Sequence, residues 1–364
     1  MKNIVLFGGA FDPIHYGHIN MAEKASQQLH ADVFFIPAKI SVWKSDSAPI
    51  EDKINMINLA IPESKAREHL FVSRFEANLD SDVNHSINTV EHFKKEYPED
   101  KLYLLIGTDQ VNSFHKWKDA DRIAELATII YFDRPDLKLD ENNIRRFKMV
   151  EIKGETVPAS STDIRELKSL DTYDSVIEYI ISHNLYFIKK IKSYMSDERF
   201  AHTLSVARLS YEIAKANKLD DAKKALIAAL LHDIGKEVPM YEQELIMKAN
   251  YGEYLDLHPA LYHQFVGAYL AEKDFGITDP VILEAIKYHT TANSNMSDVA
   301  IIVHCADKIE PTRGFDSKDL INSMKSSIKH GFVDVLHSNI EYYQKHGINY
   351  QNKLQMACIE QYLK

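Results

Sequence analysis

The chain has 364 residues, more than the roughly 250–300 at which one hydrophobic core usually stops growing, so we expect two domains. Its apolar fraction of 45% is typical of globular folds, and its formal net charge of −10 argues against nucleic acid or an anionic membrane as a partner. Two distant cysteines predict no disulfide, and no apolar run is long enough to span a membrane. We therefore expect a cytoplasmic protein whose ligands are small molecules.

Short apolar runs alternate with amphipathic stretches through the first half of the chain. The runs expected to form strands are residues 3–7, 33–37, 102–106, 128–132 and 150–152. Helices are expected between them, for example at residues 18–29 and 120–126. This alternation predicts βαβ units, and hence an α/β domain with a mostly parallel sheet.

The first expected strand runs into the string Gly-Gly-Ala-Phe-Asp-Pro-Ile-His-Tyr-Gly-His at residues 8–18, which opens a helix. Gly8 and Gly9 let the backbone approach a ligand, and a helix N-terminus offers N–H groups to phosphate. His15 and His18 are three residues apart, so both face one side of the first helical turn. Their imidazoles can stabilise charge that develops during phosphoryl transfer. The string predicts a nucleotide site, to which we also assign Phe11.

Two later segments of the first half carry groups suited to the same ligand. Gly107 and Asp109 follow the expected strand at residues 102–106, and Asp109 fits ribose recognition at the carboxyl end of a parallel sheet. The second segment offers hydroxyls, amides and a guanidinium to a triphosphate through Ser160, Ser161, Thr162 and Arg165. Ser160 can also act simply as a helix N-cap.

The string at residues 8–18 resembles the signature of the HxGH nucleotidyltransferase superfamily, and its Gly-Gly-x-Phe-Asp-Pro form resembles nicotinate-nucleotide adenylyltransferase. The resemblance covers nearly all of residues 1–187 and implies a Rossmann-like nucleotidyltransferase domain there. It implies ATP, accompanied by Mg²⁺, and nicotinate mononucleotide as substrates. His18 would stabilise the transition state, while His15, Lys44 and Arg165 hold phosphates. Trp117 either belongs to the core or, as the resemblance suggests, stacks on the pyridine ring.

The segment after the second expected strand departs from this family's pattern. Lys44 is retained, but Trp43 stands where the family usually has a histidine, and Lys53 stands where an arginine is common. These changes bear on the acceptor substrate more than on the chemistry. Another HxGH adenylyltransferase, such as one acting on pantetheine phosphate, therefore stays an alternative.

The two halves meet without a flexible linker. Residues 171–186 show apolar positions at helical spacing and lead into the next helix with no Gly, Pro or Ser cluster, so we expect closely joined domains with restricted relative motion. Strand signals then stop. Apolar residues at helical spacing occupy residues 200–216, 222–231, 265–273, 281–289 and 299–309, which predicts an all-α domain over residues 188–364.

Histidine and aspartate recur on these expected helices. His232 and Asp233 follow an apolar helix just before Gly235, which can end that helix. An aspartate in a buried stretch needs a partner, and a metal is a good one. Imidazoles with carboxylates suit iron, manganese or zinc. The predicted ligands are His202, His232, Asp233, His263, His289 and Asp307, whereas other histidines, such as His304, are expected in the core or on the surface.

Strings around these residues resemble the HD superfamily of metal phosphohydrolases and, more narrowly, the bacterial HD-type symmetrical diadenosine tetraphosphatase. They are Leu-His-Asp-Ile-Gly-Lys at residues 231–236, Tyr-His-Thr-Thr at 288–291 and Ala-Asp-Lys-Ile-Glu-Pro-Thr-Arg at 306–313. The likeness covers roughly residues 190–364. It implies one or two transition-metal ions, iron first and manganese second, and a dinucleoside polyphosphate substrate that is cleaved to two ADP.

The resemblance also implies how the predicted ligands are divided between two metal positions. It implies one metal held by His202, His232, Asp233 and Asp307, and a second completed by His263 and His289, with Asp233 bridging and serving catalysis. Lys236 and Arg313 are either phosphate contacts or solvated side chains.

Other functions remain open for the helical half. It could hydrolyse a different nucleotide, or it could be a non-catalytic nucleotide sensor that regulates the attached transferase, although the intact ligand set argues against a sensor. A homo-oligomer is compatible with the sequence. The fusion suggests a connection, because stray adenylylation yields dinucleotides that a tethered hydrolase could remove.

Overall fold

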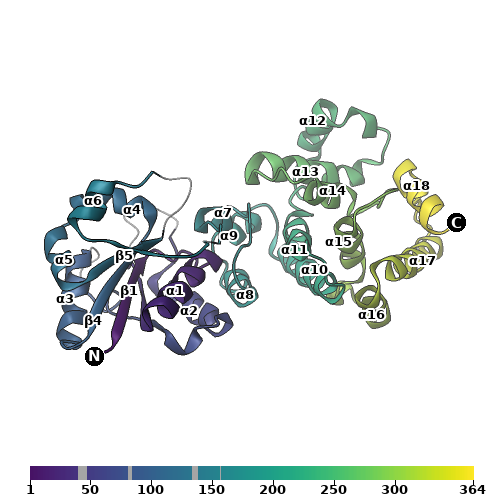
Figure 1. Ribbon diagram of the computed structural model, residues 1–364. Helices are drawn as coiled ribbons and strands as arrows, with labels where there is room; N and C mark the ends of the chain where they lie inside the picture. Colours follow the sequence, from purple (N-terminus) through teal and green to yellow (C-terminus); the bar gives the residue numbers. More distant parts are fainter. Residues whose placement is uncertain (40–46, 81–83, 133–137, 156) are drawn as a thin grey trace. The chain divides into compact units, whose positions relative to one another are not determined.

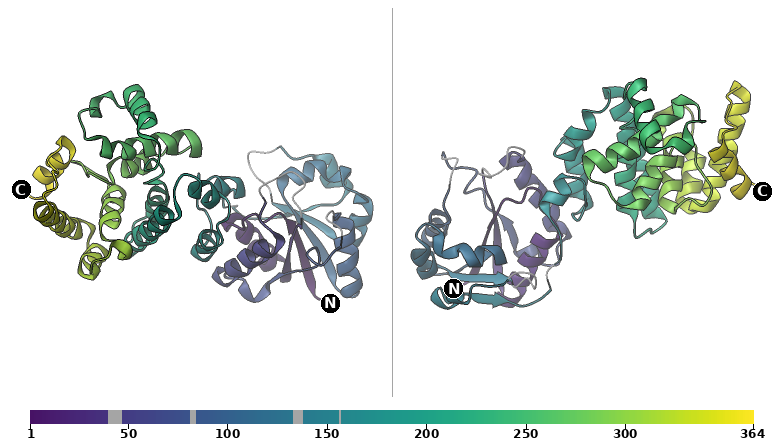
Figure 2. Two further views of the ribbon diagram at one scale, coloured as in Figure 1. Left: turned by 180° about the vertical axis from the view of Figure 1, so that it is seen from behind. Right: turned by 90° about the horizontal axis from the view of Figure 1, so that it is seen from above.

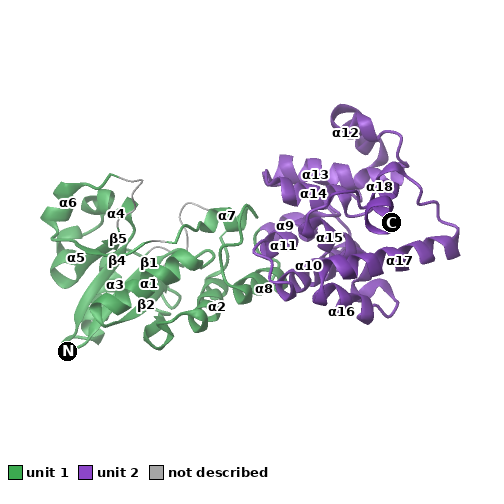
Figure 3. Ribbon diagram, turned by 45° about the vertical axis from the view of Figure 1, so that its right-hand side comes forward, with its two compact units in different colours: residues 1–186 green, residues 187–364 purple. Residues whose placement is uncertain are grey.

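The computed structural model describes residues 1–39, 47–80, 84–132, 138–155 and 157–364. The chain divides into two compact units, Met1–Tyr186 and Phe187–Lys364 (Figure 3). Within the described ranges, none of the helices has both the length and the apolar character that crossing a membrane requires.

A six-stranded parallel sheet forms the centre of the first unit (Figure 1). Its strands are β1 (Asn3–Gly9), β2 (Ala31–Pro37), β3 (Leu70–Val72), β4 (Lys101–Ile106), β5 (Thr128–Phe132) and β6 (Val150–Ile152). The order is β3-β2-β1-β4-β5-β6, and each neighbouring pair is parallel. The order reverses between β1 and β4, so a ligand crevice is expected outside the carboxyl ends of these two strands. The predicted α/β class is confirmed.

Helices cover both faces of this sheet, with α1 and α2 on one face and α3 and α5 on the other (Figure 1). The helices of the unit are α1 (Tyr16–Leu29), α2 (Ile50–Ala60), α3 (Ser86–Glu96), α4 (Thr108–Ser113), α5 (Ala120–Leu126), α6 (Glu141–Arg146), α7 (Ser161–Arg165) and α8 (Asp174–Ser182). Ile4 and Leu6 of β1 pack in one core cluster with Val90 of α3 and Ile123 of α5. Burial on both faces explains why the strands are continuous apolar runs rather than alternating ones.

The second unit, all of whose residues are described, contains helices and turns but no strand (Figure 2). Its helices are α9 (Phe187–Lys192), α10 (Asp197–Ala216), α11 (Ala222–Leu231), α12 (Met240–Asn250), α13 (Tyr262–Phe275), α14 (Pro280–Tyr288), α15 (Asp298–Ile309), α16 (Lys318–Ser326), α17 (Ile328–His346) and α18 (Lys353–Tyr362). Helices α10, α11, α14 and α15 pack together at its centre. The all-α prediction is confirmed.

Gly235 does not end α11 in the expected way. The helix stops at Leu231, His232 continues in right-handed geometry, and Gly235 is not among the residues with positive φ. A Cβ at Gly235 would lie 2.4 Å from the carbonyl oxygen of His263 and 2.6 Å from the nitrogen of Gly267. The glycine therefore allows the chain after α11 to approach α13 closely, which brings His232 beside His263.

Candidate functional site

The glycine-rich string of the first unit leaves the carboxyl end of β1 and enters α1. Gly8 is exposed, and a Cβ there would meet nothing within 4 Å, so the space in front of it is open. A Cβ at Gly9 would lie 2.9 Å from the ring of Phe11. That ring is only 1% exposed and packs edge-on against His18, with centroids 5.0 Å apart. The buried Phe11 ring therefore packs against Gly9 and the His18 ring and holds both in place.

The two histidines of the string form a stacked pair. His15 is the N-cap of α1, and its Nδ1 accepts a hydrogen bond from the backbone N–H of His18 at 3.4 Å. Their ring centroids are 3.6 Å apart, with 20° between the planes. Both imidazoles lie on the same side of the first helical turn, as the spacing predicts.

Helix α7 is tied to this loop although about 150 residues separate them in sequence. The Ser161 hydroxyl donates to the carbonyl oxygen of Pro13 at 2.9 Å. The Arg165 guanidinium donates to the carbonyl oxygen of Asp12, and its Nη1 lies 3.9 Å from the Asp12 Oδ2. The structure therefore brings two predicted phosphate-binding segments together.

Asp12 links the loop to other parts of the unit. Its carboxylate is fully buried, and its Oδ1 accepts hydrogen bonds from the Tyr186 hydroxyl at 2.8 Å and the Ala48 N–H at 2.9 Å. Burial and the neighbouring carboxylate raise the pKa of Tyr186, so the hydroxyl stays a donor. Neither the structural role of Asp12 nor that of Tyr186 was predicted from the sequence. The aspartate within the string was the available signal, whereas nothing local to Tyr186 indicates its partner.

Ser160 acts as the expected N-cap of α7, because its Oγ accepts the N–H of Asp163 at 3.3 Å. The Thr162 hydroxyl accepts from Arg165 at 3.0 Å. Contact of these hydroxyls with phosphate stays a prediction.

Gly107 and Asp109 lie where β4 ends. Gly107 is the N-cap of α4, and Asp109 is exposed in the first turn of that helix. Since Phe7 of β1 pairs with Leu105 of β4, this turn is next to the glycine-rich loop at the reversal of strand order.

Trp117 is half-buried and packs against the core cluster beside Phe114, with ring centroids 5.1 Å apart. This position is compatible with a core role and with stacking on a ligand, so both interpretations stay open. Lys44 and Trp43 lie outside the described residues.

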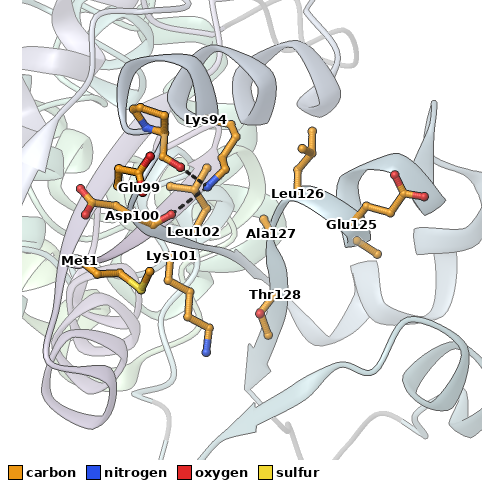
Figure 4. A pocket seen from close by; sticks show the side chains of 12 residues that line it. Met1, Lys94, Glu99, Asp100, Lys101, Leu102, Glu125, Leu126, Ala127 and Thr128 are labelled. Atoms are coloured by element: carbon orange, nitrogen blue, oxygen red, sulfur yellow. Dashed lines mark hydrogen bonds between the residues drawn. The ribbon is translucent and has the colours of Figure 1, made fainter.

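A separate pocket lies at the opposite end of the sheet, where strands β4 and β5 begin (Figure 4). It is lined by residues at the amino ends of β4 and β5, including Lys101 and Thr128. Lys94 closes one side by donating to the carbonyl oxygens of Pro98 and Asp100 at 2.9 and 3.0 Å. Because all strands are parallel, this pocket at their amino ends lies far from the glycine-rich loop, which follows the carboxyl end of β1. We therefore assign the pocket no part in the site.

The six predicted metal ligands of the second unit converge from five elements. His202 comes from α10, His232 and Asp233 follow α11, His263 comes from α13, His289 follows α14, and Asp307 comes from α15. Two groups among them could each hold a metal, His202 with His232 and Asp233, and Asp233 with His263 and His289.

Asp233 joins these two groups through its two oxygens. Its Oδ2 lies 3.4 Å from the Nε2 of His232, while its Oδ1 lies 3.7 and 3.5 Å from the Nε2 atoms of His263 and His289. Asp307 belongs to the first group, because its Oδ1 lies 3.1 Å from the Nε2 of His202. Asp233 is therefore shared by the two groups that could each hold a metal.

The imidazoles present the nitrogens that a metal needs. The Nδ1 atoms of His232, His263 and His289 donate to backbone carbonyls at 2.7, 2.8 and 2.8 Å, so each Nε2 lone pair faces the centre. The Nε2 of His232 is buried and has no hydrogen-bond partner, which would be costly without a ligand. The described residues therefore fit a metal.

The protonation states of Asp233, His263 and His289 suit metal binding. Burial alone would raise the pKa of Asp233, but the imidazoles of His232 and His289 outweigh it and hold this pKa well below its usual range. Burial lowers the pKa values of His263 and His289, so both are neutral at pH 7. Ionised carboxylates and neutral imidazoles are the forms that bind metal. Burial alone would lower the pKa of His232, but the carboxylates of Asp233 and Asp307 outweigh it and raise this pKa, so a metal would displace a proton there.

Four cationic side chains surround the cluster: Arg199, Lys236, Lys308 and Arg313. The Nη1 of Arg199 lies 2.9 Å from the Asp233 Oδ2, and the Nζ of Lys308 lies 2.8 Å from the Asp307 Oδ2. Sequence reasoning named Lys236 and Arg313 but missed the other two. Arg199 precedes His202 by three residues on the same helix face, a spacing that could have indicated it.

The chain matches two family models, Cytidylyltransferase-like over residues 6–167 and HD domain over residues 199–312. A probable nicotinate-nucleotide adenylyltransferase/Ap4A hydrolase from Mycoplasma genitalium is 33% identical over 347 residues, covering 92% of this chain and 97% of that protein. A protein of the same name from Mycoplasma pneumoniae is 31% identical over 337 residues, covering 89% and 95%.

Among solved structures, a Plasmodium falciparum nicotinic acid mononucleotide adenylyltransferase complexed with NaAD aligns with a TM-score of 0.45 and 22% identity, covering 52% of this chain and 98% of that one. Both mycoplasma relatives align with nearly the whole chain, across both units, which confirms the joint resemblance predicted from the motifs. The chain belongs to the nicotinate-nucleotide adenylyltransferase/Ap4A hydrolase family.

Proposed function

We propose that the first unit transfers the adenylyl group of ATP to nicotinate mononucleotide and that the second hydrolyses diadenosine tetraphosphate symmetrically to two ADP. Membership of the family supports both halves, because relatives from two mycoplasmas carry both activities in their names. We place both reactions in the cytoplasm, where the buried free thiols of Cys305 and Cys358 stay reduced.

The observation that supports adenylyl transfer is the contact of α7 with the loop at residues 8–18. A phosphate oxygen of nicotinate mononucleotide attacks the α-phosphorus of ATP in line, the bond to the bridging oxygen breaks, and pyrophosphate leaves. His18 stabilises charge on the α-phosphate, and His15, whose ring stacks on that of His18, binds a phosphate beside it. Mg²⁺ accompanies the triphosphate. Positioning and charge neutralisation supply most of the catalysis.

The remaining predicted contacts of this unit belong to the same proposal. Asp109 binds a ribose, Trp117 stacks on the pyridine ring, and Arg165 with Lys44 binds phosphates. The hydroxyls of Ser160, Ser161 and Thr162 complete the triphosphate site.

His18→Ala tests the transferase assignment. We expect the rate of dinucleotide formation from ATP and nicotinate mononucleotide to fall by about 10²–10³-fold, the usual effect of removing one donor to transition-state charge. The matched control is His92→Ala on α3, whose ring is 41% exposed and pairs with Glu96. Nearly full transfer by His18→Ala would show that the role assignment is wrong.

The observation that supports the hydrolase activity is the position of Asp233. Each of its two carboxylate oxygens faces a separate set of imidazoles. His202, His232, Asp233 and Asp307 would hold one metal, and His263 and His289 would complete a second. When bound, such ions activate a water and steady charge on phosphate; we propose iron, with manganese as the alternative. The four cations around the cluster bind the polyphosphate chain.

Product analysis tests this assignment. Anaerobically iron-loaded protein given diadenosine tetraphosphate should yield ADP as sole product, and His232→Ala should abolish it. His337→Ala, which alters an exposed histidine of α17, is the control. ATP with AMP as products would instead indicate asymmetrical cleavage, and no turnover would contradict the proposal.

A further inference from the structure

Three of the four histidines at the cluster point their Nδ1 at a backbone carbonyl three residues earlier in the chain. The acceptors are Ala229, Ala260 and Ile286. His232 and His289 can do so because each follows the end of a helix, where the last carbonyls have no intrahelical partner. His263 uses a carbonyl of the 3₁₀ turn Pro259–Leu261 that precedes α13.

His202 is different, because it is the sixth residue of the 20-residue helix α10. Intrahelical hydrogen bonds occupy the carbonyls around it. Its Nδ1 lies instead 3.0 Å from the Oε1 of Glu310, at the junction of α15 and the 3₁₀ turn Pro311–Arg313. A neutral imidazole has one N–H, so donating it to Glu310 leaves the Nε2 lone pair facing the cluster.

Glu310 is itself held in place. It is 1% exposed, its Oε2 accepts the N–H of Thr312 at 2.7 Å, and its Oε1 accepts the Thr312 hydroxyl at 2.7 Å. The Arg313 Nε lies 3.9 Å from the Oε1. The carboxylate is therefore oriented by its own turn and lies on the side of the His202 ring opposite the metal ligands.

We propose that Glu310 is a positioning residue for the metal held by His202, His232, Asp233 and Asp307. It fixes the tautomer of His202 and places a negative charge behind its ring, which makes this the tighter of the two metal positions. The inference rests on the proposed metal function. Carboxylates behind metal-bound histidines commonly contribute about 10–100-fold to metal affinity. The other three histidines have backbone acceptors, so the effect should be confined to one position.

Anaerobic titration of the metal-free full-length chain with Co²⁺ tests the proposal, with d–d absorption and chelator competition giving the affinity of each equivalent. We expect two equivalents in the wild type. Glu310→Ala should weaken one of them by about 10–100-fold and leave the other unchanged. Glu310→Gln should have a smaller effect, since its amide oxygen can still accept the His202 N–H while the charge is lost.

Glu237→Gln is the matched control. The Glu237 carboxylate accepts two hydrogen bonds from Ser196, the N-cap of the same helix α10, but it contacts none of the proposed ligands. This variant should bind both equivalents as the wild type does. Circular dichroism checks the fold of each variant, and Glu310→Gln decides the outcome if Glu310→Ala does not fold.

The outcomes separate this inference from the function on which it rests. Two tight equivalents in the Glu310 variants, or equal weakening of both, would overturn the positioning role and leave the metal site standing. A wild type that binds no Co²⁺ would overturn the metal function itself, and the inference with it.

Discussion

Buried carboxylates hold both sites together at the scale of single residues. Asp12 is fully buried and Asp233 is 3% exposed. A carboxylate removed from water is costly unless it is paired or hydrogen-bonded. Tyr186 and a backbone N–H donate to the Oδ1 of Asp12, and the Arg165 guanidinium lies 3.9 Å from its Oδ2. Arg199 and the imidazoles pair with Asp233. Removing one such partner should therefore disturb the site rather than only the surface around it.

Tyr186→Phe removes one hydrogen bond from Asp12 while keeping the aromatic ring. Hydrogen bonds to charged groups contribute about 1.5–3 kcal/mol. Because Asp12 orders the loop between β1 and α1, we expect kcat/KM for adenylyl transfer to fall about tenfold, with diadenosine tetraphosphate hydrolysis unchanged. Steady-state kinetics of both reactions measures this.

Tyr179→Phe provides the control for that experiment. The Tyr179 hydroxyl also donates to a carboxylate of the same unit, Asp52, at 2.8 Å, but it makes no hydrogen bond to Asp12. Its loss should leave transfer unaltered. Equal effects of the two substitutions would count against a positioning role for Tyr186.

His304 makes the free energy of unfolding of the helical unit depend on pH. It is buried, and its Nδ1 donates to the carbonyl oxygen of His289 at 2.9 Å. Burial, with Lys308 nearby, lowers the pKa of His304 from 6.5 to about 3. Between these values the unfolded chain takes up a proton that the folded chain refuses. The stabilisation from this residue is therefore complete above pH 6.5 and declines as the pH falls toward about 3.

We expect this group to contribute about 1.4 kcal/mol per pH unit to the loss of unfolding free energy on acidification. His304→Gln cannot take up the proton and should reduce the slope by that amount. Urea unfolding of the metal-free protein at several pH values measures it, with the exposed His337→Gln as control. An identical slope in His304→Gln and wild type would refute the assignment.

The residues predicted from sequence share one property, since they lie in short strings whose chemistry is local. Gly9, His18 and Asp233 could be named because neighbours in the chain carry the same signal. Glu310 and Tyr186 could not be assigned their roles, because their partners are 108 and 174 residues away. Only the fold creates those contacts.

At the scale of elements, the approach of α13 to the end of α11 decides whether the cluster forms. Gly235→Ala would place a Cβ 2.4 Å from the His263 carbonyl oxygen. Overpacking of this kind usually costs about 1–3 kcal/mol. We expect a lower melting temperature by circular dichroism and weaker Co²⁺ binding at the position shared by Asp233 and His263.

Gly252→Ala is the control for the packing argument, because a Cβ there meets nothing within 4 Å and Gly252 has no positive φ. It should change the melting temperature little. If Gly235→Ala were equally harmless, the close approach would not be a constraint.

The pattern of apolar residues predicted most elements and missed those that tertiary contacts define. The strands Thr128–Phe132 and Val150–Ile152 and the helix Ala222–Leu231 match their predicted ranges. Strand β3 was missed because it has three residues, pairs with β2 and exposes Phe71. The helical prediction for residues 171–186 was too long, since α8 spans Asp174–Ser182.

At the scale of the whole molecule, one chain supplies a transferase site and a hydrolase site in equal amounts. Transfer to nicotinate mononucleotide and transfer to a second ATP differ only in the attacking oxygen. When the γ-phosphate of a second ATP attacks the α-phosphorus, pyrophosphate leaves and diadenosine tetraphosphate forms. The proposed hydrolase would return this side product to two ADP.

His232→Ala should therefore accumulate diadenosine tetraphosphate during turnover with ATP, Mg²⁺ and nicotinate mononucleotide, whereas the wild type should not. The double variant with His18→Ala should accumulate about 10²–10³-fold less, because its transferase makes the side product that much more slowly. Mass spectrometry of the reaction mixtures distinguishes the three proteins. Absence of the dinucleotide from the His232→Ala reaction would mean that the hydrolase takes its substrate from another source, and the fusion would then need a different explanation.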